Sequence, residues 1–271
     1  TDAVSQAMAG HICGLLKSEM DVGKLPRRLT LQAGVGNVAN AVLEGLLNFD
    51  MEPLEFYSEV IQDSALDLLD AGKMRALSGT ALALSHRAMA RFIRNLTDYR
   101  RSVVLRPQEI SNNPAVIARL GLVAINTALE VDIYGNVNST HVLGTDMMNG
   151  IGGSGDFARS AALTIFIARS TAKGGTISSV VPMVSHTDHT EHDVDIIVTE
   201  QGLADLRGKD PKERAAEIIE HCAHPDYRPM LRSYYEKAYE QTGGAHTPHL
   251  LDECFAFHTR YLKTGTMKEE N

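Results

Sequence analysis

Short apolar runs alternate with stretches of helical periodicity along most of the chain. Apolar runs bounded by turn residues are typical of buried strands, whereas apolar side chains at every third or fourth position are typical of helices. We expect strands over residues 29–33, 56–61, 103–105, 122–125, 164–168, 176–183 and 194–199, and over 131–136 a strand that enters a tight turn. We expect helices over residues 3–17, 38–46, 64–71, 158–163, 229–241 and 249–262, and one that begins at Asp210-Pro211. This alternation predicts an α/β fold with a mostly parallel sheet flanked by helices.

The composition is that of an ordinary globular protein. The 271 residues are 44% hydrophobic and 22% charged, which excludes a disordered or fibrous chain and allows one large domain or two ordinary ones. The net charge of -8 argues against nucleic-acid binding, because no basic excess is available to neutralise phosphates. No apolar run approaches the roughly 20 residues that span a bilayer, so we expect no membrane partner.

The N-terminus and the cysteines bear on cellular context. The chain begins at Thr1 with neither an initiator Met nor a secretory signal pattern, so we expect a processed chain or a piece of a longer one. The three cysteines, Cys13, Cys222 and Cys254, are odd in number and far apart. They predict reduced thiols in a cytosol-like compartment rather than a disulfide framework.

A glycine-bearing turn is expected where the strand over 29–33 meets the next helix. The glycines of Gly34-Val35-Gly36 allow close approach of a ligand, and the helix start offers free N–H groups for an anion or an oxyanion. The pattern is not the dinucleotide-binding fingerprint, because Ala39 stands where its third glycine belongs. A plain tight turn between strand and helix also fits.

Glu59 lies inside the otherwise apolar strand expected over 56–61. Burying a carboxylate without a partner is costly, so Glu59 is either a structural acid or a tuned catalytic group. The residues alone leave both readings open.

A second glycine-rich segment precedes the helix expected over 158–163. Gly150, Gly152, Gly153 and Gly155 fall within six residues, and their N–H groups could hold a phosphate, a carboxylate or a thioester oxygen. The segment lacks the lysine of a P-loop, which disfavours nucleotide triphosphate hydrolysis. A purely structural role remains open.

Three histidines and three acids crowd into residues 185–193. Imidazole and carboxylate groups suit zinc or iron, but their spacing here fits no zincin or zinc-finger motif. We therefore expect a polar, hydrogen-bonded loop and no metal site. The alternative is a metal-dependent hydrolase that uses His186, His189 and His192.

Several of these segments, taken in order, resemble the acetyl-CoA hydrolase/transferase family. The resemblance is carried by residues 34–43, 58–63, 150–157 and 197–208, and extends through 222–227 and 246–251. Family members are about twice as long, and this chain resembles only their C-terminal half. The resemblance thus implies that residues 1–271 form a C-terminal domain whose N-terminal half is absent from the chain.

The resemblance also implies a fold and a set of site residues. The fold is an α/β domain of the CoA-transferase (NagB/RpiA-like) type. The nucleophile falls on Glu59, the oxyanion-site amides on Val35 and Gly153, a further active-site acid on Glu200, and a polar residue near the nucleophile on Asn112. The glycines expected to bind the cofactor are Gly34, Gly36, Gly152, Gly153 and Gly155.

The implied activity is a ping-pong CoA transfer between a short-chain acyl-CoA and a free carboxylate, through a glutamyl-CoA thioester on Glu59. Acetyl-, propionyl-, succinyl- and butyryl-CoA all fit. Coenzyme A is then substrate and covalent intermediate, with no permanently bound cofactor. An acyl-CoA hydrolase using the same site is the nearest alternative, and a non-catalytic CoA-binding or assembly domain is another. We also expect a homodimer in the cytoplasm, or in mitochondria if the source is eukaryotic.

Two departures from the family pattern flank the expected site. Ala33 replaces a small hydroxyl residue, and Ser58 stands where Thr usually precedes the glutamate. Both changes are conservative, so we expect the chemistry to be kept and the acyl preference to be tuned.

Overall fold

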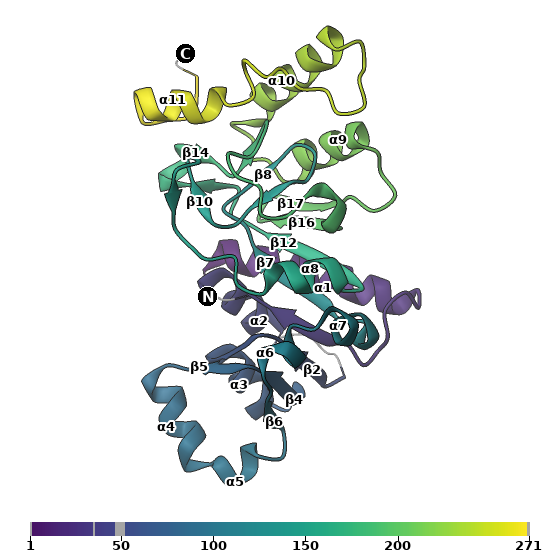
Figure 1. The fold of residues 1–271 in the computed structure, drawn as a ribbon, viewed down its shortest axis with the longest axis vertical. Helices are drawn as coiled ribbons and strands as arrows, with labels where there is room; N and C mark the ends of the chain where they lie inside the picture. Colours follow the sequence, from purple (N-terminus) through teal and green to yellow (C-terminus); the bar gives the residue numbers. More distant parts are fainter. Residues whose placement is uncertain (1, 35, 47–51, 270–271) are drawn as a thin grey trace. The chain divides into compact units, whose positions relative to one another are not determined.

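The computed structural model describes residues 2–34, 36–46 and 52–269 (Figure 1). Two compact units make up the chain. Unit 1 comprises Thr1–Thr127 and Gly153–Ile165, and unit 2 comprises Ala128–Gly152 and Phe166–Asn271. Each unit therefore contains two separate stretches of sequence.

Unit 1 is built on a parallel sheet. Its strands lie in the order β7-β1-β2-β4-β6, each pair of neighbours is parallel, and β12, which begins in unit 1, lies beside β7. The bounds are β1 (Thr30–Ala33), β2 (Leu54–Tyr57), β4 (Met74–Gly79), β6 (Val103–Leu105), β7 (Val123–Thr127) and β12 (Leu163–Ile167). A separate parallel pair joins β3 (Val60–Gln62) to β5 (Ala81–Ala83). The predicted mostly parallel sheet is confirmed.

Unit 1 also contains helices, some of which pack on this sheet. They are α1 (Ala3–Asp21), α2 (Asn37–Leu46), α3 (Asp63–Asp70), α4 (His86–Arg94), α5 (Leu96–Tyr99), α6 (Gln108–Ser111), α7 (Pro114–Leu120) and α8 (Ser154–Ser160). Helix α2 packs on β1, β7 and α1, and α7 packs on α8. A Cβ atom on Gly45 would collide with the Cβ of Ala9, so glycine is what lets α2 approach α1 so closely.

Unit 2 combines short strands with three long helices. Its strands are β8 (Glu130–Asp132), β9 (Val137–Asn138), β10 (His141–Val142), β11 (Asp146–Met147), β13 (Thr171–Ala172), β14 (Ile177–Ser178), β15 (Val180–Val181), β16 (Ile196–Thr199) and β17 (Gly202–Asp205). Its helices are α9 (Pro211–His221), α10 (Arg228–Gln241) and α11 (Ala256–Thr264). Helix α9 begins as predicted, with Asp210 and Glu213 forming a reciprocal capping box ahead of Pro211.

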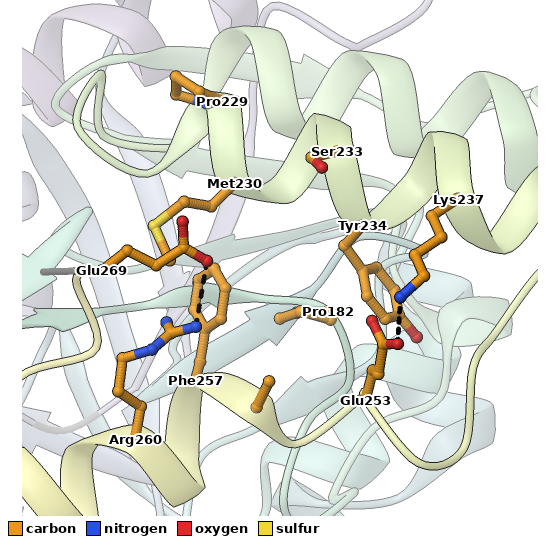
Figure 2. Close-up of a pocket in the computed structure, with 11 residues that line it drawn as sticks. Pro182, Pro229, Met230, Ser233, Tyr234, Lys237, Glu253, Phe257, Arg260 and Glu269 are labelled. Carbon is orange, nitrogen blue, oxygen red and sulfur yellow. Dashed lines mark hydrogen bonds and ion pairs between the residues drawn. The ribbon is translucent and has the colours of Figure 1, made fainter. Parts of the chain in front are cut away.

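A pocket of about 340 Å³ lies between α10 and α11 of unit 2 (Figure 2). Tyr234 and Phe257 contribute to its apolar wall. Its four charged side chains form two ion pairs, Lys237 with Glu253 and Arg260 with Glu269. Because each charge is neutralised by a neighbour, the pocket presents no unbalanced charge to a ligand.

Four predicted elements differ from the structure. The strand expected over 56–61 is interrupted after Tyr57, because the backbone carbonyl of Glu59 accepts hydrogen bonds from Thr80 and Ala81 instead of continuing a ladder. The strand over 176–183 is two short strands, β14 and β15. Helix α8 begins four residues earlier than predicted, inside the glycine-rich segment. Helix α11 begins only at Ala256, because turns occupy residues 251–255.

Two further expectations concern the chain as a whole. The three cysteines are buried free thiols, as their spacing predicted. Among the described residues, no helix combines the length and the apolar character that crossing a membrane requires.

Candidate active site

Glu59 lies in the bend between β2 and β3, two residues beyond the carboxyl end of β2. Ligands of parallel α/β sheets bind at this end of the strands. The backbone of the bend is fixed, since the Glu59 carbonyl accepts from the Thr80 N–H at 2.7 Å and from the Ala81 N–H at 3.3 Å. The side chain is half-buried and so remains accessible.

The backbone N–H of Gly153 donates to Oε2 of Glu59 at 2.6 Å. A Cβ atom at position 153 would overlap both that carboxylate oxygen and the side-chain nitrogen of Asn112. Only glycine therefore permits this approach of backbone to carboxylate. The structure thus brings Glu59, Gly153 and Asn112 together, although they are far apart in sequence.

The Asn112 side chain is buried and unsatisfied. Neither its Oδ1 nor its Nδ2 has a hydrogen-bond partner within the described part of the chain. Leaving a buried amide unpaired costs about 1–3 kcal/mol, so folding stability does not explain its presence. An amide held beside a carboxylate and free of protein partners is suited to bind a polar group of a ligand.

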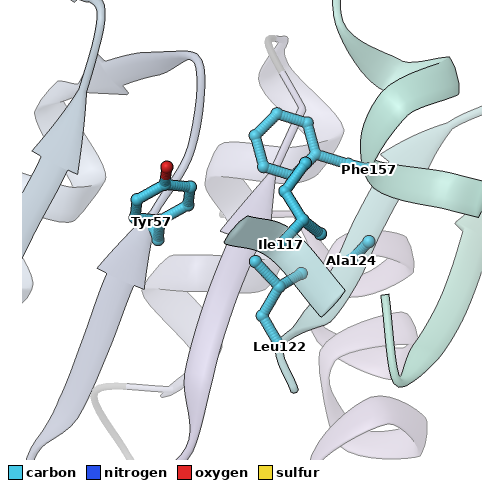
Figure 3. Close-up of a cluster of buried hydrophobic side chains, with 5 residues drawn as sticks. All are labelled: Tyr57, Ile117, Leu122, Ala124 and Phe157. Carbon is cyan, nitrogen blue, oxygen red and sulfur yellow. The ribbon is translucent and has the colours of Figure 1, made fainter. Parts of the chain in front are cut away.

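A hydrophobic cluster anchors all three residues (Figure 3). It packs Tyr57 of β2 and Phe157 of α8 with Ile117 of α7, Ala124 of β7, and Leu122 between α7 and β7. The Tyr57 hydroxyl also donates to the carbonyl of Ile110 at 2.6 Å. Because Glu59, Gly153 and Asn112 each lie within four residues of a clustered or tethered residue, packing determines the geometry of the site.

The first glycine turn lies against the strands that flank Glu59. The Ser58 hydroxyl donates to the carbonyl of Ala33 at 3.0 Å, and the Gln62 amide donates to the carbonyl of Gly34 at 3.0 Å. Gly36 has a φ of 131°, which favours glycine. Val35 lies outside the described residues.

The other glycines of the second segment are distributed between the units. Gly152 belongs to unit 2 and has a φ of 55°, whereas Gly155 lies in the first turn of α8. Of this segment, the amide that reaches Glu59 is that of Gly153.

Glu200 lies in unit 2, just after β16. Its carboxylate accepts hydrogen bonds from the N–H and hydroxyl of Ser170 and from the side chain of Gln201. Burial alone raises the pKa of this carboxyl, but the hydrogen bonds from Ser170 outweigh burial and lower it. Glu200 is therefore an ionised, well-oriented carboxylate at neutral pH.

The histidine-rich segment is a hydrogen-bonded loop, as expected. The Asp188 carboxylate accepts from the N–H of Ser139 and the hydroxyl of Thr140, both at 2.8 Å. His189 is buried against Phe166, with ring centroids 4.7 Å apart. Within the described ranges no group of three or more His, Cys, Asp or Glu side chains is arranged to hold a metal ion.

Sequence reasoning missed two buried polar groups. Gln62 contacts the first glycine turn, and its only signal was its place three residues after Glu59. In unit 2, His258 of α11 lies 2.8 Å from Glu130, which also accepts from Ser185. Nothing in local spacing could pair residues 128 positions apart.

The acetyl-CoA hydrolase/transferase C-terminal domain model matches residues 88–235, more than half of the chain. The chain belongs to this family. It is 58% identical to succinyl-CoA:acetate CoA-transferase of Clostridium kluyveri over 98% of its own length and 49% of that protein's. It is 47% identical to acetyl-CoA hydrolase of Candida glabrata, over all of its own length and 53% of that protein's.

The solved structures agree with this family assignment. The fold matches RipA from Yersinia pestis with a TM-score of 0.75 and 28% identity, over 90% of this chain and 54% of RipA. This member of the acetyl-CoA hydrolase/transferase family therefore spans about half the length of the curated relatives it matches. The resemblance read from the ordered motifs is confirmed at the level of the family.

Proposed function

We propose that this acetyl-CoA hydrolase/transferase domain carries the nucleophile of a CoA-transferase. The enzyme moves CoA between a short-chain acyl-CoA and a free carboxylate, with Glu59 as the residue that is acylated. The observation that carries the proposal is the 2.6 Å hydrogen bond from the Gly153 N–H to the Glu59 carboxylate, beside the unpartnered amide of Asn112. The similarity to succinyl-CoA:acetate CoA-transferase supports it.

The reaction proceeds through covalent intermediates on Glu59. A carboxylate oxygen of Glu59 attacks the acyl-CoA carbonyl, and the carbon–sulfur bond breaks to release CoA thiolate and leave a mixed anhydride. The thiolate then attacks the glutamyl carbonyl and expels the original acid as its carboxylate, which leaves a glutamyl-CoA thioester. A second carboxylate reverses these steps. A carboxylate is ionised at neutral pH, so the nucleophile needs no separate base.

Gly153 and Asn112 stabilise the negative charge that develops on oxygen during these steps. Each attack at the glutamyl carbonyl converts one oxygen of Glu59 into an oxyanion, and the Gly153 N–H already points at Oε2. Donors arranged in advance for an oxyanion are each worth about 10²–10³ in kcat. The Asn112 amide supplies a second donor from the same side, and the family resemblance adds the amide of Val35 and the acid Glu200.

Hydrolysis is the second candidate, because a relative that is 47% identical is an acetyl-CoA hydrolase. Water that attacks the glutamyl thioester would release CoA without a second acid. The two activities are separated by measuring free CoA and new acyl-CoA formed from acetyl-CoA with and without added succinate. Transfer predicts a new acyl-CoA in proportion to the added acid, whereas hydrolysis predicts free CoA that is insensitive to it.

The proposal extends to partners and location. We propose that the domain works with the N-terminal half found in its longer relatives and self-associates as a homodimer. The three buried, unpaired thiols support a reducing compartment such as the cytoplasm. Size measurement in solution tests the self-association.

Trapping the intermediate tests the mechanism. The protein at its full natural length is incubated with acetyl-CoA, reduced with borohydride, digested, and analysed by mass spectrometry. We expect Glu59 to be recovered as the alcohol that forms on reduction of its thioester, and Glu59→Gln to give neither adduct nor activity. An active enzyme with unmodified Glu59 would exclude this mechanism.

A further inference from the structure

We infer that Gln62 is a positioning residue that holds the first glycine turn against the bend that carries Glu59. The inference rests on the proposed function of Glu59 and adds a residue to it. Gln62 ends β3, three residues after Glu59, and its side chain is buried. Its chemistry gives it one amide donor group and one carbonyl acceptor, and both are used on the turn.

The contacts of Gln62 fall on either side of one residue. Its Nε2 donates to the carbonyl of Gly34 at 3.0 Å, and its Oε1 accepts from the N–H of Gly36 at 3.4 Å. Gln62 thereby holds the carbonyl of Gly34 and the N–H of Gly36 with one side-chain amide. No shorter polar side chain at position 62 could span both groups with one amide.

A second set of contacts fixes Gln62 itself. Its Oε1 also accepts from Nδ2 of Asn40 on α2 at 3.3 Å, and the Ser64 hydroxyl donates to the Asn40 carbonyl oxygen at 2.7 Å. The amide of Gln62 is thus oriented by a chain of partly buried hydrogen bonds that ends on α3. Because both of its polar atoms have partners, Gln62 cannot rotate without breaking at least two of them.

The contact between Gln62 and the turn affects the nucleophile because Gln62 lies only three residues after Glu59 in the chain. Ser58 binds the carbonyl of Ala33 and Gln62 binds that of Gly34, so residues before and after Glu59 hold successive carbonyls of the turn. The turn and the nucleophile therefore keep a fixed relative position. An oxyanion donor is effective only when its position is fixed before the reaction begins. Losing the hydrogen bonds that fix the turn therefore lowers kcat more than it weakens substrate binding.

The test compares Gln62→Leu with wild type and with Leu68→Ala in the protein at its full natural length. Leu68 is fully buried in α3, so its truncation destabilises unit 1 without touching the turn. We expect Gln62→Leu to lower kcat by about 10²-fold, since misplaced catalytic groups cost that much, with KM for acetyl-CoA within about threefold. We expect hydrogen exchange at the amide of Gly36, which donates to Gln62, to quicken about tenfold.

The readouts separate the possible failures. A Gln62→Leu enzyme whose kcat stays within about threefold of wild type, or falls no further than that of Leu68→Ala, overturns the inference. Unchanged amide exchange in the turn overturns it as well. A wild-type enzyme without an adduct at Glu59 overturns the proposed function instead, and the exchange rates still decide whether Gln62 holds the turn.

Discussion

Adding one methyl group at Gly153 is expected to disable the site without unfolding the protein. Gly153 has φ -86° and ψ 4°, a conformation that alanine adopts, so Gly153→Ala introduces no backbone strain. The new Cβ would instead overlap the Glu59 carboxylate and the buried Asn112 amide. The cheapest relaxation turns the carboxylate away from the amide, because the Glu59 backbone is fixed by Thr80 and Ala81.

The size of the expected fall in kcat follows from the loss of one hydrogen-bond donor to the oxyanion. Removing one oxyanion donor costs about 2.7–4 kcal/mol of barrier, so kcat for CoA transfer should fall by about 10²–10³. Steady-state transfer from acetyl-CoA to succinate measures this loss, and borohydride trapping should show a matching loss of the Glu59 adduct. The free energy of unfolding should change by no more than the roughly 1.5–3 kcal/mol of one charge-assisted hydrogen bond.

Two controls isolate the steric effect. Gly14→Ala places the same methyl group in open space on α1, where alanine is preferred to glycine by about 1 kcal/mol, so it should stabilise the protein and leave transfer unchanged. At Gly155 a Cβ would make only an ordinary 3.5 Å contact with Arg159, so Gly155→Ala should lower kcat far less than Gly153→Ala. A Gly153→Ala enzyme with wild-type kcat would refute the assignment of this amide.

Further predictions concern stability. His258→Ala leaves the buried carboxylate of Glu130 without the imidazole nitrogen that lies 2.8 Å away, and should lower the free energy of unfolding by about 3–5 kcal/mol, measured by urea denaturation. Burial raises the pKa of Glu130, but the interactions with His258, Ser185 and Asn138 together outweigh burial and lower it below the usual 4.5. The stability that the ionised Glu130 contributes is therefore present above pH 4.5 and lost as the pH falls below it. Glu130→Gln should reduce this loss of unfolding free energy at acid pH. An unchanged dependence of the unfolding free energy on pH would contradict the assignment. Tyr57→Phe removes the hydrogen bond to Ile110 and should cost about 1 kcal/mol, whereas no change in the urea midpoint would show that packing alone holds the strand.

The sequence predicted the elements that depend on local patterning. The strand over 29–33, the helix after it and the capped start of α9 all follow from apolar spacing or from side chains that satisfy a helix end. The break at Ser58-Glu59 could not be predicted, because it depends on hydrogen bonds from Thr80, between β4 and β5, and from Ala81 of β5. The start of α8 at Ser154 could not be predicted either, because glycines have a low intrinsic helix propensity. There, tertiary contacts outweigh that propensity.

The candidate site was predictable in parts and not as a whole. Glu59 and the two glycine segments could be singled out as unusual residues, but only the resemblance assigned them roles. That Asn112 is buried without a partner, and that Gly153 donates to Glu59, follows from packing around Tyr57 and Phe157 rather than from any spacing.

The division of unit 1 into two stretches has a mechanical consequence. The chain passes between the units at three peptide bonds, and the second of them joins Gly152 to Gly153. The amide nitrogen of that peptide bond is the donor to the Glu59 carboxylate. A change of backbone conformation at Gly152, in unit 2, would therefore turn the same peptide group that supplies the donor in unit 1.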